Sequence, residues 1–387
     1  MLLIKNGKIL TMNGENYERG CVLIDNGKIK KVSDKIEETS DMEVIDAEGC
    51  IVMPGIIDAH CHIGLVEENM GFEGDDINEA SNPVVPELRA IDGINPMDVA
   101  FDDAVKAGIT GVMTGPGSGN VMGGQFVFMK TKGTCVDDMV ILEPSAVKVA
   151  FGENPKRFYG KKGKMPVTRM ATAALLRETL TKAKFYMAKK NKAFKEGDLF
   201  EEDFKLEALI PVLERKIPLK AHAHRADDIL TAIRIAKEFN IKMTLDHCTE
   251  GHLISKYVKK SEFPAIVGPS LTSRSKIELQ NKTFKTPGIL AKAGVKVAIM
   301  TDHPVIPVGY LPICAGLAAK DGLGIEEAYK AITINSAEIC GVSNRVGSIE
   351  EGKDADIAIF TGNPMEVFTE AKYTIINGEI VFSKNTK

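Results

Sequence analysis

The sequence predicts an α/β protein, a (β/α)8 TIM-like barrel joined to a small β domain that both chain ends build. Short apolar segments alternate with amphipathic helical segments through the middle of the 387 residues, which is typical of parallel β/α units. The two ends instead share the motif I-x-N-G-x-I, at 4–9, 24–29 and 375–380. A chain of this length holds one barrel and one appended small domain.

The β domain is predicted from the Asn-Gly pairs of that motif. Asn-Gly between β-forming residues favours a tight hairpin, because both turn residues accept positive φ. A further strand is predicted at 356–360. Since one hairpin alone is marginal in water, we expect both ends to fold together into one antiparallel domain, with two unrelated edge hairpins as the alternative. We place this domain at 1–52 plus 346–387 and the barrel at 53–345.

The barrel is predicted from a count of its elements. Strands are expected at 51–57, 109–113, 126–130, 146–151, 218–224, 241–247, 265–268 and 295–301. Helices are expected at 97–107, 167–189, 201–215, 227–239, 286–293 and 325–331. Gly108 and Gly294 follow two of these helices and suit the position after a helix end. Eight strands separated by helices match a (β/α)8 barrel.

Three segments are expected at the mouth of the barrel, where the strands end. The insertion 64–96 is acidic, and the insertion 152–217 opens with a run of basic residues. Such charge runs usually form solvated surface, but in a barrel these two would face each other as an acidic and a basic lip. The glycine-rich segment 115–124 lacks the spacing and the lysine of a nucleotide-binding loop, so we interpret it as a flexible mouth loop that approaches the substrate.

Composition excludes several classes of protein. The net charge of −4 provides no electrostatic footprint for nucleic acid or an acidic membrane, and no apolar run has the length of a membrane span. The seven scattered cysteines indicate reduced thiols, and the first residues contain too short an apolar run for a signal peptide. We therefore expect a cytoplasmic protein that acts on a small molecule, without nucleic-acid or membrane partners.

Metal-ligand residue types end several predicted strands. His60 and His62 end the first, and their i, i+2 spacing puts both on one side of the strand, as a first-row metal requires, while Cys61 points to the other side. His222 ends the fifth strand, His247 the sixth and Asp302 the eighth. Each alone fits a buried histidine or a capping aspartate. Because parallel strands end at one mouth, all five are expected to converge.

The segment 54–62, PGIIDAHCH, resembles the signature of the amidohydrolase superfamily, as do His222, His247 and Asp302 at their strand ends. The segment 347–356 is similar to that superfamily's return into its β-sandwich. The resemblance spans nearly the whole chain and is nearest to the imidazolonepropionase-like, cyclic-amide and dipeptide-hydrolysing branches. It implies that the terminal domain is a β-sandwich and that the protein is a homo-oligomer.

The resemblance also implies a ligand set. His60, His62 and Asp302 would bind a buried metal, and in two-metal members His222 and His247 bind a second ion while a carboxylated lysine bridges both. Lys148 is the residue for that bridge, because a bare ammonium in an apolar strand is costly, although a lysine that reaches outward is the alternative. Glu153 is an alternative carboxylate ligand or base. Zn²⁺ is the expected ion, with Mn²⁺ or Fe²⁺ as alternatives.

The ligands predict a mechanism. A bound ion lowers the pKa of its water to about 7, and Asp302 would accept the proton and deliver it to the leaving nitrogen. The second ion, or His247 in one-metal members, would stabilise the oxyanion. We therefore expect a metal-dependent hydrolase that cleaves the C–N bond of an amide, cyclic amide or dipeptide. The alternatives are a one-metal deaminase of a ring amidine and a non-catalytic scaffold, which would lack the ligands.

Further residues are expected near the substrate. His224 and Arg225 follow a predicted ligand, and His224 shares its strand side. Arg274 follows the seventh strand, where it could bind a carboxylate or be a helix-surface charge. His303 is expected in a supporting role, and His252 outside the ligand set.

Overall fold

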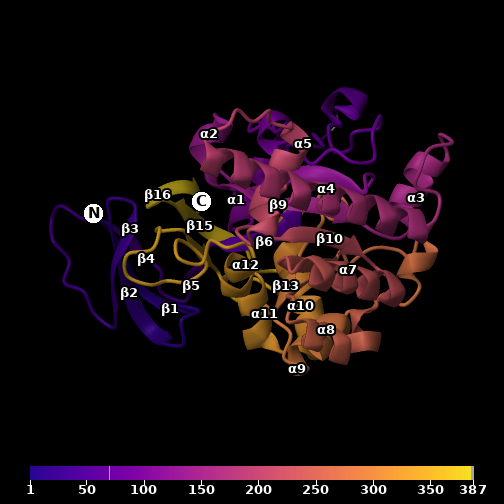
Figure 1. Ribbon diagram of the computed structural model, residues 1–387. Helices are drawn as coiled ribbons and strands as arrows, with labels where there is room; N and C mark the ends of the chain where they lie inside the picture. The colour runs from indigo at the N-terminus through magenta and orange to yellow at the C-terminus, as the bar shows by residue number, and fades with distance from the viewer. Residues whose placement is uncertain (69, 385–387) are drawn as a thin grey trace.

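The computed structural model describes residues 1–68 and 70–384, and these contain two eight-stranded sheets (Figure 1). The barrel-like sheet has the order β13-β12-β11-β10-β9-β8-β7-β6. The terminal sheet has the order β16-β15-β14-β5-β1-β2-β3, with β4 paired to β1. Figure 1 shows the strands of the two chain ends beside the helix-covered barrel.

The barrel strands are short and buried, as apolar strands covered on both faces must be. They are β6 (Ile56–Cys61), β7 (Ile109–Thr114), β8 (Met122–Lys130), β9 (Val140–Ala150), β10 (Leu219–Ala223), β11 (Met243–His247), β12 (Ala265–Val267) and β13 (Val297–Ile299). Two backbone hydrogen bonds link the last strand to the first beyond their ends, from Asp302 N to His60 O (3.3 Å) and from His62 N to His303 O (2.9 Å). The sheet is therefore nearly closed.

The prediction of eight parallel strands is wrong at the third strand. β8 runs antiparallel to both β7 and β9, whereas the other neighbours in this sheet are parallel. The connection 115–121 contains no helix and is too short for the crossover that a parallel strand needs. The glycine-rich segment is thus a hairpin connection, and it lies at the mouth as expected.

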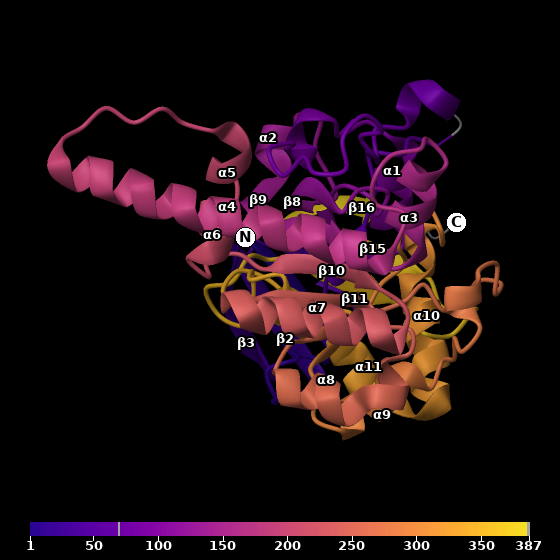
Figure 2. The same cartoon turned by 45° about the vertical axis from the view of Figure 1, so that its right-hand side comes forward.

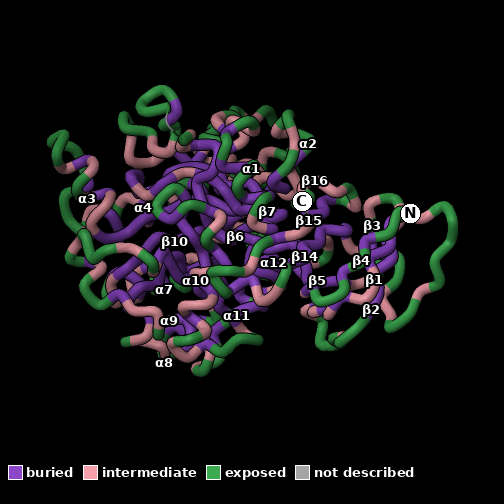
Figure 3. Tube along the Cα trace, turned by 180° about the vertical axis from the view of Figure 1, so that it is seen from behind, coloured by how far each residue is buried: buried purple, intermediate pink, exposed green. Residues whose placement is uncertain are grey.

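Helices cover the outside of the barrel. They are α1 (Val99–Lys106), α2 (Val136–Met139), α3 (Glu153–Gly160), α4 (Arg169–Glu196), α5 (Phe204–Glu207), α6 (Ile210–Leu213), α7 (Ala226–Phe239), α8 (Ser255–Ser261), α9 (Thr286–Lys292), α10 (Leu311–Ala318), α11 (Ile325–Ala331) and α12 (Ile334–Ile339). Figure 2 shows α4 and α7 in front of β10 and β11, and Figure 3 shows buried residues concentrated within the barrel. The helix expected at 201–215 is instead split into α5 and α6, since Pro211 begins a new helix.

The two ends of the chain do pair, as predicted. The strands are β1 (Leu2–Ile9), β2 (Tyr17–Asp25), β3 (Lys28–Ser33), β4 (Glu43–Asp46), β5 (Ile51–Pro54), β14 (Ile357–Phe360), β15 (Ala371–Ile376) and β16 (Glu379–Ser383). β5 pairs antiparallel with β14, which joins the N-terminal strands to the C-terminal ones. The sheet is not purely antiparallel, because β1 runs parallel to β4 and β5, and a separate β-sandwich is not confirmed. The predicted domain boundaries stay a prediction.

The three Asn-Gly pairs do not all form turns. Asn26-Gly27 and Asn377-Gly378 have positive φ at both residues and connect β2 to β3 and β15 to β16. Asn6-Gly7 lies within β1 at a β-bulge, where a Cβ on Gly7 would lie 2.5 Å from Val52 Cγ2. This glycine thus permits close strand packing, and the predicted third hairpin is wrong.

A buried ion-pair network joins the barrel to the terminal sheet. Lys130, at the end of β8, donates to Asp354 Oδ2 (2.8 Å), Asp356 Oδ1 (2.9 Å) and Asn377 Oδ1. Asp354 also pairs with Lys28 Nζ (2.6 Å) and Arg345 NH2 (2.8 Å). Burial alone would raise the pKa of Asp354, but the hydrogen bonds of Lys130 and Lys28 lower it to about 2. The network therefore ties β3, β8 and the C-terminal segment together.

None of the helices within residues 1–68 and 70–384 combines the length and the apolar character that a bilayer span requires.

The Lys130 network predicts a stability difference between two neighbouring lysines. Lys130→Met leaves two buried carboxylates without their main cation, so we expect a loss of about 3–5 kcal/mol in unfolding free energy. Lys132→Met breaks only the exposed pair with Asp102 and should cost less than about 1 kcal/mol. Urea unfolding monitored by circular dichroism measures both, and equal midpoints for the two variants would contradict the network's role.

Candidate active site

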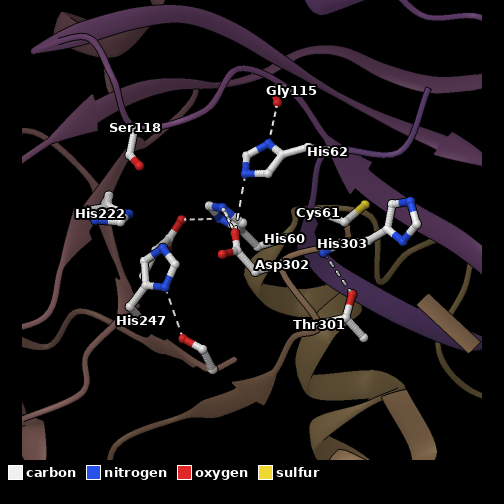
Figure 4. A network of polar contacts seen from close by, with 12 residues as sticks. His60, Cys61, His62, Gly115, Ser118, His222, His247, Thr301, Asp302 and His303 are labelled. Atoms are coloured by element: carbon white, nitrogen blue, oxygen red, sulfur yellow. Dashed lines mark hydrogen bonds and ion pairs between the residues drawn. The ribbon is translucent and has the colours of Figure 1, made fainter. Parts of the chain in front are cut away.

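The predicted ligand residues meet at the mouth of the barrel. His60 lies in β6 and His62 just beyond it, Lys148 in β9, His222 in β10, and His247 at the end of β11. Asp302 follows β13, and the close-up shows His60, His62, His222, His247 and Asp302 around one centre (Figure 4). The convergence of strand ends that the sequence predicted is therefore present in the structure.

The side chains form two groups of three. His60 Nε2 and His62 Nε2 lie 3.4 Å and 3.2 Å from Asp302 Oδ1. His222, His224 and His247 form the second group, and within each group the ligand atoms lie within 4.8 Å of one another. The His222 and His247 ring centroids are 4.1 Å apart, and those of His60 and His247 are 5.5 Å apart. The two groups are thus adjacent.

The outer ring nitrogen of three of the histidines donates to a fixed acceptor. His62 Nδ1 donates to the carbonyl of Gly115 (2.6 Å), and His247 Nδ1 donates to that of Gly268 (2.9 Å). His60 Nδ1 donates to Asp246 Oδ2 (2.6 Å). Because carbonyls and carboxylates only accept, Nδ1 carries the proton in these three rings and the Nε2 lone pair faces the centre.

Burial favours the neutral form of four histidines at the centre, His60, His222, His224 and His247. Desolvation lowers the pKa of His60 to about 4 and that of His224 to about 3. It also holds the pKa values of His222 and His247 well below the usual range. Since a metal ligand must be the unprotonated imidazole, the rings need not lose a proton near neutral pH before binding an ion.

Asp302 is the anion of the centre. Burial alone would raise its pKa, but the imidazoles of His247, His60 and His62 around the carboxylate hold the pKa well below its usual range. Asp302 and His247 also share an unusual backbone, with φ of 56° and 68°. Residues with side chains rarely adopt the left-handed region, and such strain concentrates at functional sites.

A second layer of buried charges supports His60. Asp246 accepts not only from His60 but also from Lys220 Nζ (3.1 Å) and Thr244 Oγ1 (2.7 Å). Lys220 also donates to the carbonyl of Ala59 (2.9 Å). Lys148 is fully buried, so it does not reach outward, and its Nζ lies 3.0 Å from His60 Nε2. Burial lowers the pKa of Lys148 to about 8.

The residues present fit a divalent metal ion. Two histidine nitrogens and one carboxylate oxygen form the first group and three histidine nitrogens form the second, and such N/O ligands suit Zn²⁺ and other first-row ions. His247 Nε2 is buried and has no hydrogen-bond partner among the described residues. A buried lone pair without a donor is costly, and a cation would satisfy it. The Nδ1 hydrogen bonds of His60, His62 and His247 likewise leave their Nε2 lone pairs free to bind an ion.

Several predicted residues lie elsewhere. Arg225 pairs with Asp227 at the start of α7 (2.9 Å and 3.0 Å), and the exposed Arg274 donates to the carbonyls of Gln280 and Lys282 within its own loop. Each guanidinium thus has a local structural role here.

The Glu153 carboxylate pairs with Arg157 (3.6 Å) at the surface of α3 and is not in either ligand group. His303 points away from the centre, and His252 binds Thr249 O and Thr286 Oγ1.

Other residues near the centre were missed by the sequence reasoning. Asp246 and Lys220 are charged residues within apolar strands, the same signal that singled out Lys148. Glu278 is buried, and its Oε1 lies 3.8 Å from His224 Nε2. Asn154 Nδ2 lies 3.4 Å from His222 Nε2 and donates to Ser118 Oγ (2.8 Å). The last three lie on loops or at a helix start, where nothing in the local pattern marks them.

The two charged lips do meet, although through backbone carbonyls rather than carboxylates. Lys162 donates to Ala80 O (3.0 Å) and Lys164 to Ser81 O (3.1 Å). The hydroxyl of Tyr159 donates to Glu79 O (2.7 Å). The insertions after β6 and β9 thus brace each other at the mouth.

Comparison with known proteins identifies one family for the chain. The model of the Amidohydrolase family matches residues 51–381. A solved structure, an amidohydrolase from Thermotoga maritima MSB8, is 44% identical with a TM-score of 0.96, covering 99% of this chain and 100% of that one.

Curated relatives are more distant. Amidohydrolase tasK of Hapsidospora irregularis is 28% identical over 94% of this chain, and the match spans only 40% of that relative's length. Imidazolonepropionase of Thermoplasma volcanium is 24% identical over 99% of this chain and 98% of its own. Two deaminases of adenosine derivatives each match only 16% of this chain.

The second layer predicts an effect on metal affinity. Asp246→Asn weakens the acceptor that orients His60 and leaves Lys220 without its carboxylate, so we expect a 10- to 100-fold loss of Zn²⁺ affinity. Competition with a chromogenic chelator measures the affinity, and circular dichroism checks the fold. Asp103→Asn removes an exposed carboxylate on α1 and serves as the control. Equal affinity in Asp246→Asn and Asp103→Asn would contradict this role for Asp246.

Proposed function

The chain belongs to the amidohydrolase family, and its relatives are hydrolases of carbon–nitrogen bonds, as predicted. We propose that it cleaves an amide, a cyclic amide or a dipeptide with the help of one or two divalent metal ions. The observation that carries this proposal is the convergence of histidine nitrogens around the Asp302 carboxylate at the barrel mouth. A non-catalytic scaffold would have no need for this set.

The proposed ligands divide between two ions. His60, His62 and Asp302 would hold one, and His222 and His247 would hold the other, with His224 at its side. Lys148, once carboxylated, would supply the anionic ligand shared by both groups. In support, its Nζ lies against His60 Nε2, and a pKa of about 8 increases the fraction of neutral amine that carboxylation requires. When bound, the ions, Zn²⁺ in our proposal, supply a Lewis acid and lower the pKa of water.

The proton transfers are assigned to Asp302. Its carboxylate is ionised at neutral pH, and at 12% side-chain exposure it is the more accessible member of its group. It accepts the proton of the attacking water and returns it to the leaving nitrogen, which is general acid–base catalysis by one group.

The hydrogen bond of His247 favours the two-metal alternative. For His247 to polarise a substrate carbonyl by itself, its Nε2 would have to donate a proton. Its Nδ1 already donates to Gly268 O, and its lowered pKa excludes a second proton near pH 7. The Nε2 atom is therefore available as a metal ligand, and an ion held there would supply the Lewis acid.

Deamination of a ring amidine is the second candidate, because deaminases occur among the relatives. They match short parts of the chain, whereas imidazolonepropionase matches nearly all of it. Ammonia release with one ion per chain would support the deaminase. Release of an amine or opening of a cyclic amide with two ions per chain supports the leading proposal.

The remaining proposals concern the surroundings of the enzyme. We propose a small-molecule substrate, a homo-oligomer, and a cytoplasmic location without nucleic-acid or membrane partners. All seven cysteines are free thiols, which suits a reducing compartment. His224 remains a proposed substrate contact, since its ring lies 4.7 Å from that of His222. Arg225 and Arg274 would have to leave their present partners to reach a substrate.

Loss of the Asp302 carboxylate should abolish turnover without unfolding the protein. Asp302→Asn keeps the shape of the side chain but cannot accept the proton, so kcat/KM should fall by at least about 10²- to 10⁴-fold. Hydrolysis of a panel of N-acyl amino acids, dipeptides and cyclic amides by the Zn²⁺-loaded enzyme measures this, with Asp103→Asn as the exposed control. Turnover retained in Asp302→Asn would overturn the assignment.

Metal removal should test the bridge. We expect about two ions per chain by elemental analysis, and activity lost after dialysis against dipicolinate should return with Zn²⁺. If Lys148 is carboxylated, bicarbonate should speed that recovery in the wild type. The Lys148→Met variant should bind less metal, and bicarbonate should not change its rate of recovery. A Lys148→Met variant that retains two ions and full activity would remove Lys148 from the proposed ligand set.

A further inference from the structure

A hollow of about 450 Å³ opens beside the metal-ligand centre and is lined by cations. Arg157, Lys161 and Lys162 reach it from α3 and the turn after it, and Lys276 reaches it from the loop after β12. The other lining residues are Asn78, Ser118, Gly119, Asn154 and Phe158, so no carboxylate lines the hollow. Four positive charges therefore surround a space large enough for part of a small molecule.

These cations are poorly compensated. Within the described ranges the Lys161 ammonium has no hydrogen-bond or ion-pair partner, and Lys162 Nζ donates only to the carbonyl of Ala80 and lies over the Phe158 and Tyr159 rings (4.6 Å and 6.0 Å). Arg157 is 3.6 Å from Glu153 and half-exposed. Lys276 is 3.8 Å from Glu278 Oε1. Like charges held near one another repel, so their convergence suits a hollow that receives an anion.

One amide group separates the hollow from the centre. Asn154 accepts from Lys276 Nζ through Oδ1 (2.6 Å), and its Nδ2 lies 3.4 Å from His222 Nε2. A molecule with its scissile bond at the centre would therefore place a neighbouring group among the cations.

The walls of the hollow are braced before any ligand arrives. Tyr159 OH donates to the carbonyls of Glu79 and Asn82 (2.7 Å and 2.8 Å), which holds α3 against the loop after β6. Asn120 Nδ2 donates to the same two carbonyls and to Tyr159 OH. These hydrogen bonds hold the α3 segment that carries three of the cations, which reduces the entropic cost of binding.

We infer that this hollow is the specificity subsite of the enzyme, and that it selects substrates carrying an oxyanion, a carboxylate or a phosphate, on the part of the molecule next to the scissile C–N bond. The inference rests on the proposed function, because it names the substrate class of that site. Arg157 and Lys161 lie one helical turn apart and are the residues for the first contact with the anion.

The test removes two charges without touching the centre. In Arg157→Gln/Lys161→Gln, kcat/KM for substrates with a free carboxylate should fall about 10-fold or more, mainly through KM, because the lost contact stabilises ground state and transition state alike. The methyl esters of the same N-acyl amino acids and dipeptides should be poor substrates of the wild type and change less than about 2-fold. Rates are followed chromatographically at low ionic strength.

The matched control removes two exposed charges from another helix. Lys184→Gln/Lys189→Gln lies toward the far end of α4, where neither lysine has an ion-pair partner in the structure's described part, and it should behave as wild type. Equal losses in the two double variants would overturn the inference, because they would reflect net charge alone. Wild-type enzyme that prefers the esters would overturn it as well.

Binding separates this inference from the proposed function. Calorimetric titration of the metal-loaded protein with succinate, inorganic phosphate and neutral succinamide should give binding of an anion, at least about 5-fold weaker in Arg157→Gln/Lys161→Gln and unchanged in the control. Preference for succinate or for phosphate identifies the oxyanion. If no compound of the panel is hydrolysed but anion binding is weaker in Arg157→Gln/Lys161→Gln and unchanged in the control, the proposed function is wrong and the subsite is supported. Anion binding that is identical in both double variants overturns the subsite.

Discussion

The architecture of the centre depends on one carboxylate, that of Asp246, which has to satisfy a histidine, an ammonium and a hydroxyl at once. A buried charge is tolerated only when it is paired and fully hydrogen-bonded, and here His60, Lys220 and Thr244 do this from three directions. The contact with His60 Nδ1 also fixes the tautomer of that ring. The pairing of β10 with β11 brings Lys220 opposite Thr244 and His222 opposite Asp246, so the register of two strands sets the charge balance of the centre.

The reversed strand β8 has a comparable effect on the other side of the mouth. In a barrel of uniform β/α units a helix would follow β7, and the chain would leave the mouth. Here the chain turns back at once, and the backbone carbonyl of Gly115 stays within reach of His62 Nδ1. The short glycine-rich connection thus supplies an acceptor that a crossover helix would have carried away. It also brings Ser118 to Asn154, so the same segment contributes to the wall of the cationic hollow.

Sequence reasoning located the ligand-type residues because their signal is local. His60, His62, His222, His247 and Asp302 each end an apolar segment, and strand ends meet in any barrel. It failed where the deciding contact is distant: the direction of β8 follows from its pairing with two neighbours, and Asn6-Gly7 is a bulge because β1 packs against Val52. The substrate-contact roles of Arg225 and Arg274 were predicted from position alone and stay predictions; in the structure Arg225 pairs with Asp227 in the first turn of α7, and Arg274 donates to carbonyls of its own loop. Lys220 and Asp246 carried a readable signal, a charge in an apolar strand, but only the barrel interior reveals that the two charges belong together.

The pairing of β5 with β14 has a consequence for how the protein is made. During synthesis the first five strands leave the ribosome early, yet the outer hydrogen-bonding edge of β5 meets its partner only after the entire barrel has been translated. An open strand edge is a template for association with other chains, and long-range pairing forms slowly. The nascent N-terminal segment therefore passes through a long interval of exposure, and a truncated chain that ends before residue 357 would keep that edge open permanently. The terminal sheet is therefore complete only once β14, β15 and β16 have been translated.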